Sequence, residues 1–186
     1  MPKRGATLRF ATSNKHKVEE ARRLLGVALE PVDVSTDEIQ AATLEEIVHA
    51  KLERARASVD GPLLVEDVAL GLDALGGFPG PYIRWLLESA GGAGLATIAS
   101  ALRDRSARAR CALAYWDGSV VSLFVGETPG EILLEPRGTA GFGWDAWFLP
   151  RGASATYAEM SSDDKDRISH RGRAFELLRR ELGDRV

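Results

Sequence analysis

A short, wholly apolar run at residues 63–65 places the tightest constraint on the fold of this chain. A strand with no polar residue on either side has to be covered on both faces, which puts it inside a sheet with helices in front and behind. The run follows a Gly-Pro turn signal and leads directly into Glu66 and Asp67. We therefore predict a central strand with these carboxylates at its carboxyl end, where open α/β sheets bind their ligands.

Strand and helix patterns alternate in the part of the chain before this run. Residues 8–11 are typical of a short buried strand, and the polar turn after them leads into a segment with apolar residues at helical spacing. Thr43 and Glu46 have the spacing of a capping box, which predicts the start of a second helix. These segments predict strand, loop and helix units that form the parallel core of a sheet.

The later part of the chain carries an antiparallel signal. Two alternating segments, 108–115 and 120–125, flank Asp117 and Gly118, and this pattern predicts a β-hairpin. The other expected elements are helices at 82–88 and 95–102, a strand at 130–134 and a last helix that begins near His170. We predict a mixed α/β fold with a parallel core and an antiparallel extension, formed by a single domain over residues 1–186.

Composition limits the class of function. The formal net charge of -3 argues against a nucleic-acid-binding protein, which needs basic surface to displace counterions, but it allows a small anionic ligand in a local positive pocket. No apolar stretch reaches the ~20 residues of a membrane-spanning helix, so we expect a cytoplasmic protein with no membrane partner. The single cysteine, Cys111, lies in a strand-like apolar run and is expected to be an inert buried thiol.

A polar loop from Thr12 to Lys17 opens the first predicted helix. A helix amino terminus presents unpaired N–H groups and a partial positive charge, so the hydroxyls, amide and lysines of this loop would suit a phosphate. Such loops are common, and an ordinary N-capped helix that carries exposed lysines explains the segment more simply. It lacks the glycines of a P-loop, which counts against a Walker-type nucleotidase.

Three carboxylates are candidate magnesium ligands. Glu38 lies in an acidic turn, and Glu66 and Asp67 follow the apolar run. Mg²⁺ is a hard cation that accepts carboxylate oxygens and keeps several waters. Neighbouring side chains of a strand point to opposite faces, so only one of Glu66 and Asp67 needs to face a metal site. Adjacent carboxylates also occur without any such role.

Two further segments could bind a nucleobase. Residues 142–148 place Asp145 among aromatic rings, where a purine could stack, or these rings are simply part of the core. His170 and Arg171 precede the last helix, and they are either solvated residues at its start or donors to a base carbonyl or a phosphate. Spacing alone leaves both alternatives open for each segment.

The order of four segments is far more specific than any one of them. They are residues 10–17 (FATSNKHK), 64–81 (LVEDVALGLDALGGFPGP), 142–148 (FGWDAWF) and 156–173 (TYAEMSSDDKDRISHRGR). With them the chain resembles, nearly end to end, the inosine triphosphate pyrophosphatase family, also described as dITP/XTP pyrophosphatases. The resemblance implies an elongated, two-lobed α/β fold, with a mixed sheet flanked by helices, a nucleotide cleft between the lobes and usually a homodimer. It also implies magnesium-dependent hydrolysis of ITP, dITP and XTP to the monophosphate and pyrophosphate.

The resemblance further implies roles for particular residues. Asp67 would position or deprotonate the attacking water, and Lys17 and Glu38 would complete the catalytic group, with Glu38 and Asp67 as the magnesium ligands. The triphosphate would be held by Thr12, Ser13, Asn14, Lys17 and, as a weaker transfer, Lys51. The base pocket would be formed by Phe142, Gly143, Trp144, Asp145, Lys165, His170 and Arg171.

Base selection follows from hydrogen-bond donors at the purine 6-oxygen. His170 and Arg171 can donate there, whereas the amino group of adenine would leave them unpaired at a cost of about 1–3 kcal/mol. Two positions depart from the family pattern: Val68 follows Asp67 where many relatives have a hydroxyl residue, and Ala146 replaces a proline. A pyrophosphatase with another base preference and a nucleotide-binding regulator with weak catalysis remain the alternatives.

Overall fold

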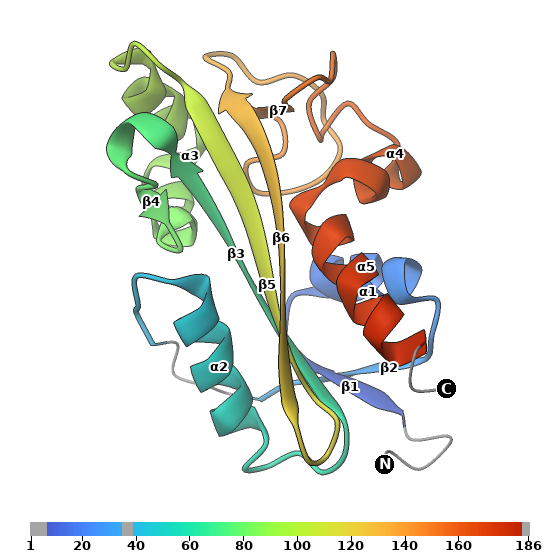
Figure 1. Ribbon diagram of the computed structural model, residues 1–186. Coiled ribbons are helices and arrows are strands. Elements are labelled where there is room, and N and C mark those ends of the chain that lie inside the picture. Colours follow the sequence, from blue (N-terminus) through green and yellow to red (C-terminus); the bar gives the residue numbers. More distant parts are fainter. Residues whose placement is uncertain (1–6, 35–38, 184–186) are drawn as a thin grey trace. The chain divides into compact units, whose positions relative to one another are not determined.

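The computed structural model describes residues 7–34 and 39–183 as alternating strands and helices (Figure 1). In chain order they form β1 (Leu8–Ala11), α1 (Lys15–Leu25), β2 (Leu29–Val32), α2 (Leu44–Ala55), β3 (Leu63–Leu72), η1 (Asp73–Leu75), β4 (Pro79–Gly80), α3 (Ile83–Ser100), β5 (Ser106–Trp116), β6 (Val121–Ile132), β7 (Phe148–Pro150), α4 (Ser162–Ile168) and α5 (His170–Gly183). The strands form one seven-stranded sheet in the order β2-β1-β3-β5-β6-β7, with β4 paired to β3. Strand β1 pairs in parallel with β2 and β3, whereas β4 and β7 pair antiparallel with their neighbours. The predicted mixed α/β fold with a parallel core is confirmed.

The described residues divide into two compact units. The first unit contains residues of the ranges 1–67, 111–126 and 171–186, and the second contains 68–110 and 127–170. Strands β3, β5 and β6 each contribute residues to both units. Each unit buries its own set of apolar side chains.

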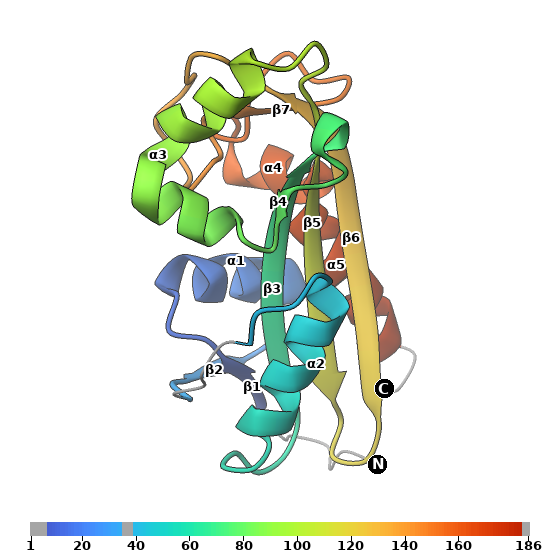
Figure 2. The ribbon, with the colours of Figure 1, turned by 90° about the vertical axis from the view of Figure 1, so that its left-hand side faces the viewer.

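The first unit covers its strands on both faces. Helix α2 lies on one face, and α1 and α5 lie on the other (Figures 1 and 2). Leu63 and Leu64 are neighbours on β3, so their side chains point to opposite faces, yet both are fully buried. Two-sided coverage of this strand is what its apolar run predicts. Cys111 on β5 is also fully buried, as expected.

The second unit has a mixed aliphatic and aromatic core. Leu70 on β3 and Leu95 on α3 pack in one buried cluster with Trp144, Phe148 and Tyr157. Helix α3 lies on one face of the strands and α4 on the other (Figure 2). The position of Trp144 and Phe148 in this cluster shows that part of the aromatic segment 142–148 is core.

Strand β3 is longer than its sequence predicts, and this changes the place of the two carboxylates. The apolar run was expected to end at Glu66, but the strand continues to Leu72. Its second half pairs with β4, with Leu70 opposite Gly80. Glu66 and Asp67 therefore lie in the middle of a strand, not at its carboxyl end. Residues 68–72 are apolar except for one glycine, so nothing in their chemistry ends the strand at the carboxylates.

Other predicted elements are confirmed or corrected. The capping box of Thr43 and Glu46 is present at the start of α2, and Asp117 accepts backbone hydrogen bonds in the turn of the β5–β6 hairpin. Residues 130–132 are the end of β6 and do not form a separate strand. The two helices expected at 82–88 and 95–102 are present as the two parts of α3, which are separated by non-helical backbone at Gly91, where the φ of 64° suits glycine. The short elements β2, β4, β7 and α4 were not predicted.

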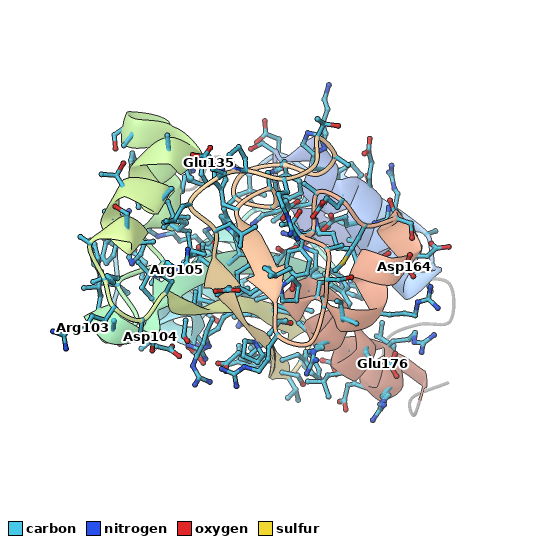
Figure 3. The ribbon with its side chains drawn as sticks, turned by 90° about the horizontal axis from the view of Figure 1, so that it is seen from above. Arg103, Asp104, Arg105, Glu135, Asp164 and Glu176 are labelled. Carbon is cyan, nitrogen blue, oxygen red and sulfur yellow. The ribbon has the colours of Figure 1, made fainter. Side chains whose placement is uncertain are left out.

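Charged side chains on the outer surfaces of α4 and α5 pair with neighbours about one helical turn away. Asp164 pairs with Arg167, and Glu176 pairs with Arg179 and Arg180 (Figure 3). Exposed pairs of this kind contribute little to stability. Within the described part of the chain, no helix combines the length and the apolar character needed to cross a membrane.

Candidate functional site

The loop between β1 and α1 is organised by the side chain of Asn14. Its Oδ1 atom accepts hydrogen bonds from the backbone N–H groups of His16 (3.0 Å) and Lys17 (3.3 Å). The backbone N–H of Asn14 donates to Thr12 Oγ1 (3.2 Å). Asn14 is therefore the N-cap of α1. Ser13 is exposed beside it. The cap fixes the first turn of the helix and, with it, the direction in which Lys17 leaves the backbone.

Glu66 and Asp67 on β3 contact helices on opposite faces of the first unit. The wholly buried side chain of Glu66 accepts two hydrogen bonds at Oε1 from Arg171 of α5, at 2.8 and 3.0 Å. The Oδ2 atom of Asp67 lies 3.3 Å from Nζ of Lys51 on α2. Neighbouring side chains of an extended backbone point to opposite faces, and the two carboxylates accordingly have different surroundings.

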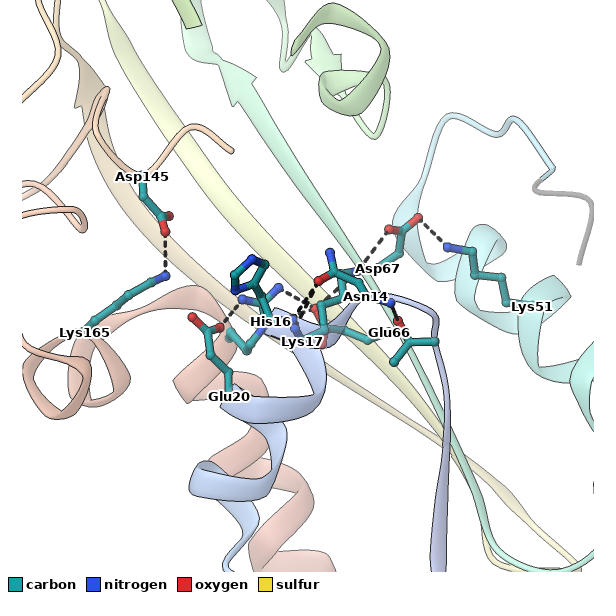
Figure 4. A network of polar contacts seen from close by, with 11 residues as sticks. Asn14, His16, Lys17, Glu20, Lys51, Glu66, Asp67, Asp145 and Lys165 are labelled. Atoms are coloured by element: carbon teal, nitrogen blue, oxygen red, sulfur yellow. Dashed lines mark hydrogen bonds and ion pairs between the residues drawn. The ribbon is translucent and has the colours of Figure 1, made fainter. Parts of the chain in front are cut away.

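Lys17 joins these two carboxylates. Its Nζ atom lies 3.6 Å from Glu66 Oε1 and 3.8 Å from Asp67 Oδ1 (Figure 4). Lys17 and Lys51 are mostly buried, with side chains 12% and 14% exposed, while Asp67 is the most exposed member at 21%. Asp67 is thus the carboxylate of this cluster that solvent or a ligand reaches most easily.

Arg171 lies in the same cluster and not with its sequence neighbour His170, which belongs to the second unit. Its guanidinium donates to Glu66 and also to Glu20 of α1. Burial disfavours the charged form, but the carboxylates of Glu66 and Glu20 favour it more strongly, so the pKa of Arg171 is raised. Glu20 and Glu66 were not predicted as partners of Arg171. Nothing in local spacing links them to it, so its expected place in a base pocket stays a prediction.

We refer to Lys17, Lys51, Arg171, Glu20, Glu66 and Asp67 as the charge cluster. Its three cations and three carboxylates balance in formal charge. Because removal of one partner from a buried ion pair is strongly destabilising, the residues of the cluster depend on one another for charge compensation. The nearby thiol of Cys111 is not reactive in this setting, because burial and then the Glu66 carboxylate raise its pKa well above its ordinary value.

The second unit brings together the other predicted site residues. Lys165 of α4 donates to Asp145 Oδ2 at 2.8 Å, and both side chains are buried. The backbone N–H of Phe142 donates to the same oxygen at 2.9 Å. A Cβ atom on Gly141 would lie 2.2 Å from that oxygen, so the loop needs glycine there. Asp145 therefore fixes the loop that carries Phe142 and Gly143.

Aromatic rings line this part of the second unit. The His170 ring lies 5.2 Å from the Trp144 ring and 5.8 Å from the Tyr157 ring, centroid to centroid. The Lys165 ammonium lies 5.2 Å from the centroid of the partly exposed Phe142 ring, within the range of a cation–π contact. His170 is buried, so it is not the solvated residue that one reading of the sequence expected.

Not all predicted metal ligands can be placed. Glu38 lies outside the described residues. Among the residues that are described, no group of three or more His, Cys, Asp or Glu side chains is arranged to hold a metal ion. Asp67 is the predicted metal ligand that the structure does place.

The fold is that of an α/β protein. The charge cluster lies around the middle of its central strand, β3. The chain belongs to the Ham1 family, whose model matches residues 8–181. It is 44% identical over 171 residues to a dITP/XTP pyrophosphatase of Thermococcus kodakarensis, which covers 90% of this chain and 92% of that protein. It is 45% identical over 175 residues to an inosine triphosphate pyrophosphatase of Pyricularia oryzae, covering 92% and 91%. The solved structure of a HAM1 protein from Coxiella burnetii matches with a TM-score of 0.83 at 29% identity, covering 96% of this chain and 98% of the other.

Proposed function

We propose that this protein hydrolyses non-standard purine nucleoside triphosphates, namely ITP, dITP and XTP, to the nucleoside monophosphate and pyrophosphate. Relatives that cover most of the chain are pyrophosphatases of these nucleotides. The observation that carries the proposal is the position of Asp67, which is partly exposed and has a lysine beside each of its oxygens. Carboxylates and ammonium groups at this spacing serve the two needs of the reaction, proton removal from water and binding of phosphate oxygens.

The reaction adds one water molecule across the anhydride between the α- and β-phosphates. The bond between these phosphates breaks, pyrophosphate leaves, and one proton of the water has to be taken up. Asp67 accepts that proton or orients the water, and Lys17 and Lys51 neutralise charge that develops on the leaving pyrophosphate. Lys17 leaves the capped first turn of α1, so its backbone has a defined position, and its flexible side chain brings the ammonium to 3.8 Å from Asp67 Oδ1.

Magnesium is the expected cofactor, and the chemistry of Asp67 fits it. Mg²⁺ is commonly held by one or two carboxylates together with substrate phosphates and waters, so a cluster of three protein ligands is not required. Asp67 supplies a hard oxygen donor that is 21% exposed. Glu38 is the second ligand by family resemblance. When bound, the ion would add positive charge at the phosphates and so stabilise the leaving group.

The base pocket belongs to the second unit in this proposal. Phe142 offers a partly exposed aromatic face, Trp144 borders the proposed pocket from the buried cluster, and the buried pair of Lys165 and Asp145 holds the loop that carries Phe142. His170, whose ring packs beside those of Trp144 and Tyr157, is the donor proposed for the purine 6-oxygen. Adenine carries an amino group at that position and would leave the donor unpaired, at a cost of about 1–3 kcal/mol.

We extend the proposal to a cytoplasmic homodimer that binds neither nucleic acid nor membrane. The support for this part is the family resemblance and the net charge of -3. Light scattering coupled to size-exclusion chromatography measures the oligomeric state directly. A monomer at micromolar concentration would contradict the dimer and leave the proposed reaction intact.

A product assay tests the proposed function. ITP, XTP, GTP and ATP are each incubated with the protein at fixed magnesium, and pyrophosphate is separated from orthophosphate. We expect pyrophosphate from ITP and XTP, with little from GTP and ATP. Orthophosphate as the first product would show that the cleaved bond is wrong, and equal rates on all four nucleotides would show that the base pocket is wrong.

Asp67→Asn tests the assignment of the catalytic carboxylate. We expect kcat to fall by about 10²–10⁴-fold, because the amide neither accepts a proton nor carries negative charge. Glu53→Gln is the matched control, since Glu53 is an exposed carboxylate on α2 that pairs with Arg56. The control should keep its activity. Equal rates for the Asp67 variant and the wild type would remove Asp67 from the mechanism.

A further inference from the structure

Each carboxylate oxygen of Asp67 faces an ammonium group. Lys17 Nζ lies 3.8 Å from Oδ1, and Lys51 Nζ lies 3.3 Å from Oδ2. The two lysines come from different helices, α1 and α2 (Figure 4). The two carboxylate oxygens of Asp67 therefore face lysine side chains from two different helices.

The same lysines are the residues proposed to hold the triphosphate. The lysines cannot fully pair with Asp67 and bind the triphosphate at the same time, because an ammonium group that turns toward phosphate oxygens gives up part of its interaction with Asp67. A divalent cation at Asp67 would in turn be repelled by two positive charges within about 4 Å of the carboxylate oxygens it needs. These contacts thus oppose metal binding at Asp67, and a triphosphate that drew the ammonium groups away would relieve that opposition.

We infer that Lys17 and Lys51 form a cage around Asp67, and that the triphosphate opens the cage by drawing both ammonium groups to its own oxygens. The inference rests on the proposed function for the identity of the anion. The divalent cation then binds weakly to the free protein and tightly to the protein–nucleotide complex. Coupling of this kind is reciprocal, so the cation also tightens the binding of the nucleotide.

The charge balance of the cluster supports this order of events. Glu66, next to Lys17, already has Arg171 as a hydrogen-bonded partner, so it does not lose its compensation when Lys17 moves. Asp67 has the larger exposure of the two carboxylates and is the one that a cation reaches. Departure of the lysines therefore uncovers the accessible carboxylate and leaves the buried one paired.

The cage predicts that removing one lysine strengthens metal binding in the absence of nucleotide. Mn²⁺ is used as the probe, and free Mn²⁺ is measured by electron paramagnetic resonance in a titration of the protein alone. Lys51→Met, which keeps the apolar stem, should bind Mn²⁺ about tenfold more tightly than the wild type, since one repelling charge is gone. Lys51→Gln should act in the same direction. Lys15→Met, at an exposed lysine of α1, should not change the affinity.

A second titration measures the coupling itself. An ITP analogue with a non-hydrolysable α,β-methylene group binds Mn²⁺ by itself, so the same titration without protein is subtracted. With this correction the analogue should tighten Mn²⁺ binding to the wild type by more than about tenfold, and to Lys51→Met by clearly less. Asp67→Asn should abolish the Mn²⁺ binding that the Lys51 variants gain. Equal Mn²⁺ affinities for the wild type and both folded Lys51 variants without nucleotide would overturn the cage.

The outcomes separate the cage from the proposed function. Tighter Mn²⁺ binding by the Lys51 variants, together with no release of pyrophosphate from ITP or XTP by the wild type, would support the cage and contradict the proposed function. Pyrophosphate release by the wild type, together with unchanged Mn²⁺ affinity in the Lys51 variants, would support the proposed function and contradict the cage.

Discussion

Arg171→Met removes the guanidinium at the centre of the buried ion pairs of the first unit. The Arg171 side chain is 3% exposed and lies between Glu66 at 0% and Glu20 at 11%. Its hydrogen bonds to Glu66 Oε1 are 2.8 and 3.0 Å long. After the substitution Glu66 retains Lys17, at 3.6 Å, as a cationic neighbour. One buried carboxylate then has a single, longer contact in place of a forked hydrogen bond.

The expected loss follows from the burial of these charges. Removing one partner of a buried ion pair leaves a charge that is not solvated and, here, only partly compensated, which costs about 3–5 kcal/mol of unfolding free energy. For a chain of this length that corresponds to a fall in Tm of about 6–20 °C. Arg171→Lys keeps the charge but not the planar fork, so its loss should be smaller, about 1–3 kcal/mol. Adding Glu66→Gln to Arg171→Met should recover part of the loss, because the amide is neutral.

Urea unfolding at pH 7, followed by tryptophan fluorescence and far-UV circular dichroism, measures these differences. Arg179→Met is the matched control, because Arg179 is an arginine of the same helix that is 60% exposed and pairs with Glu176. The control should change the unfolding free energy by less than about 0.5 kcal/mol. If Arg171→Met loses no more than Arg179→Met, the buried pairs do not stabilise the fold and the reasoning is refuted.

Two more predictions concern packing and burial. Gly92→Ala should lower the unfolding free energy by about 1–3 kcal/mol, although alanine is the better helix former, because its Cβ would lie 1.9 Å from Trp147 Nε1. Trp147→Leu in the same chain should restore part of the loss, and stabilisation by Gly92→Ala alone in urea unfolding would contradict this packing. Burial raises the pKa of Cys111. Above about pH 8.5 the thiol therefore ionises in the unfolded chain but stays protonated in the folded protein, and the unfolding free energy falls by up to about 1.4 kcal/mol per pH unit. The difference in unfolding free energy between the wild type and Cys111→Ala should therefore be constant below pH 8 and shrink above pH 9. A difference that does not vary with pH would show that the thiol ionises equally in the folded and unfolded states.

Local chemistry determined much of this fold from the sequence alone. The capping box of Thr43 and Glu46, the Asp117 turn and the doubly buried run of β3 each depend on residues that are close together in the chain. Such features form in the same way in many tertiary settings, so their patterns predict them well. Asn14 as the cap of α1 belongs to the same class, because its hydrogen bonds reach only two and three residues ahead.

The length of β3 and the pairing of charges were decided by tertiary structure. The strand continues past Asp67 in a sheet where β5 is its neighbour and where β4 pairs with Leu70 and Gly71. Arg171 meets Glu66 across a separation of 105 residues, and its partner Glu20 is 151 residues away. The family resemblance places Arg171 and His170 in one base pocket; Arg171 belongs to the first unit and His170 to the second, and that pocket stays a prediction. Buried charges take the partners that packing brings within reach, since an unpaired charge out of water is too costly, and only the folded arrangement of β3, α1 and α5 defines those partners.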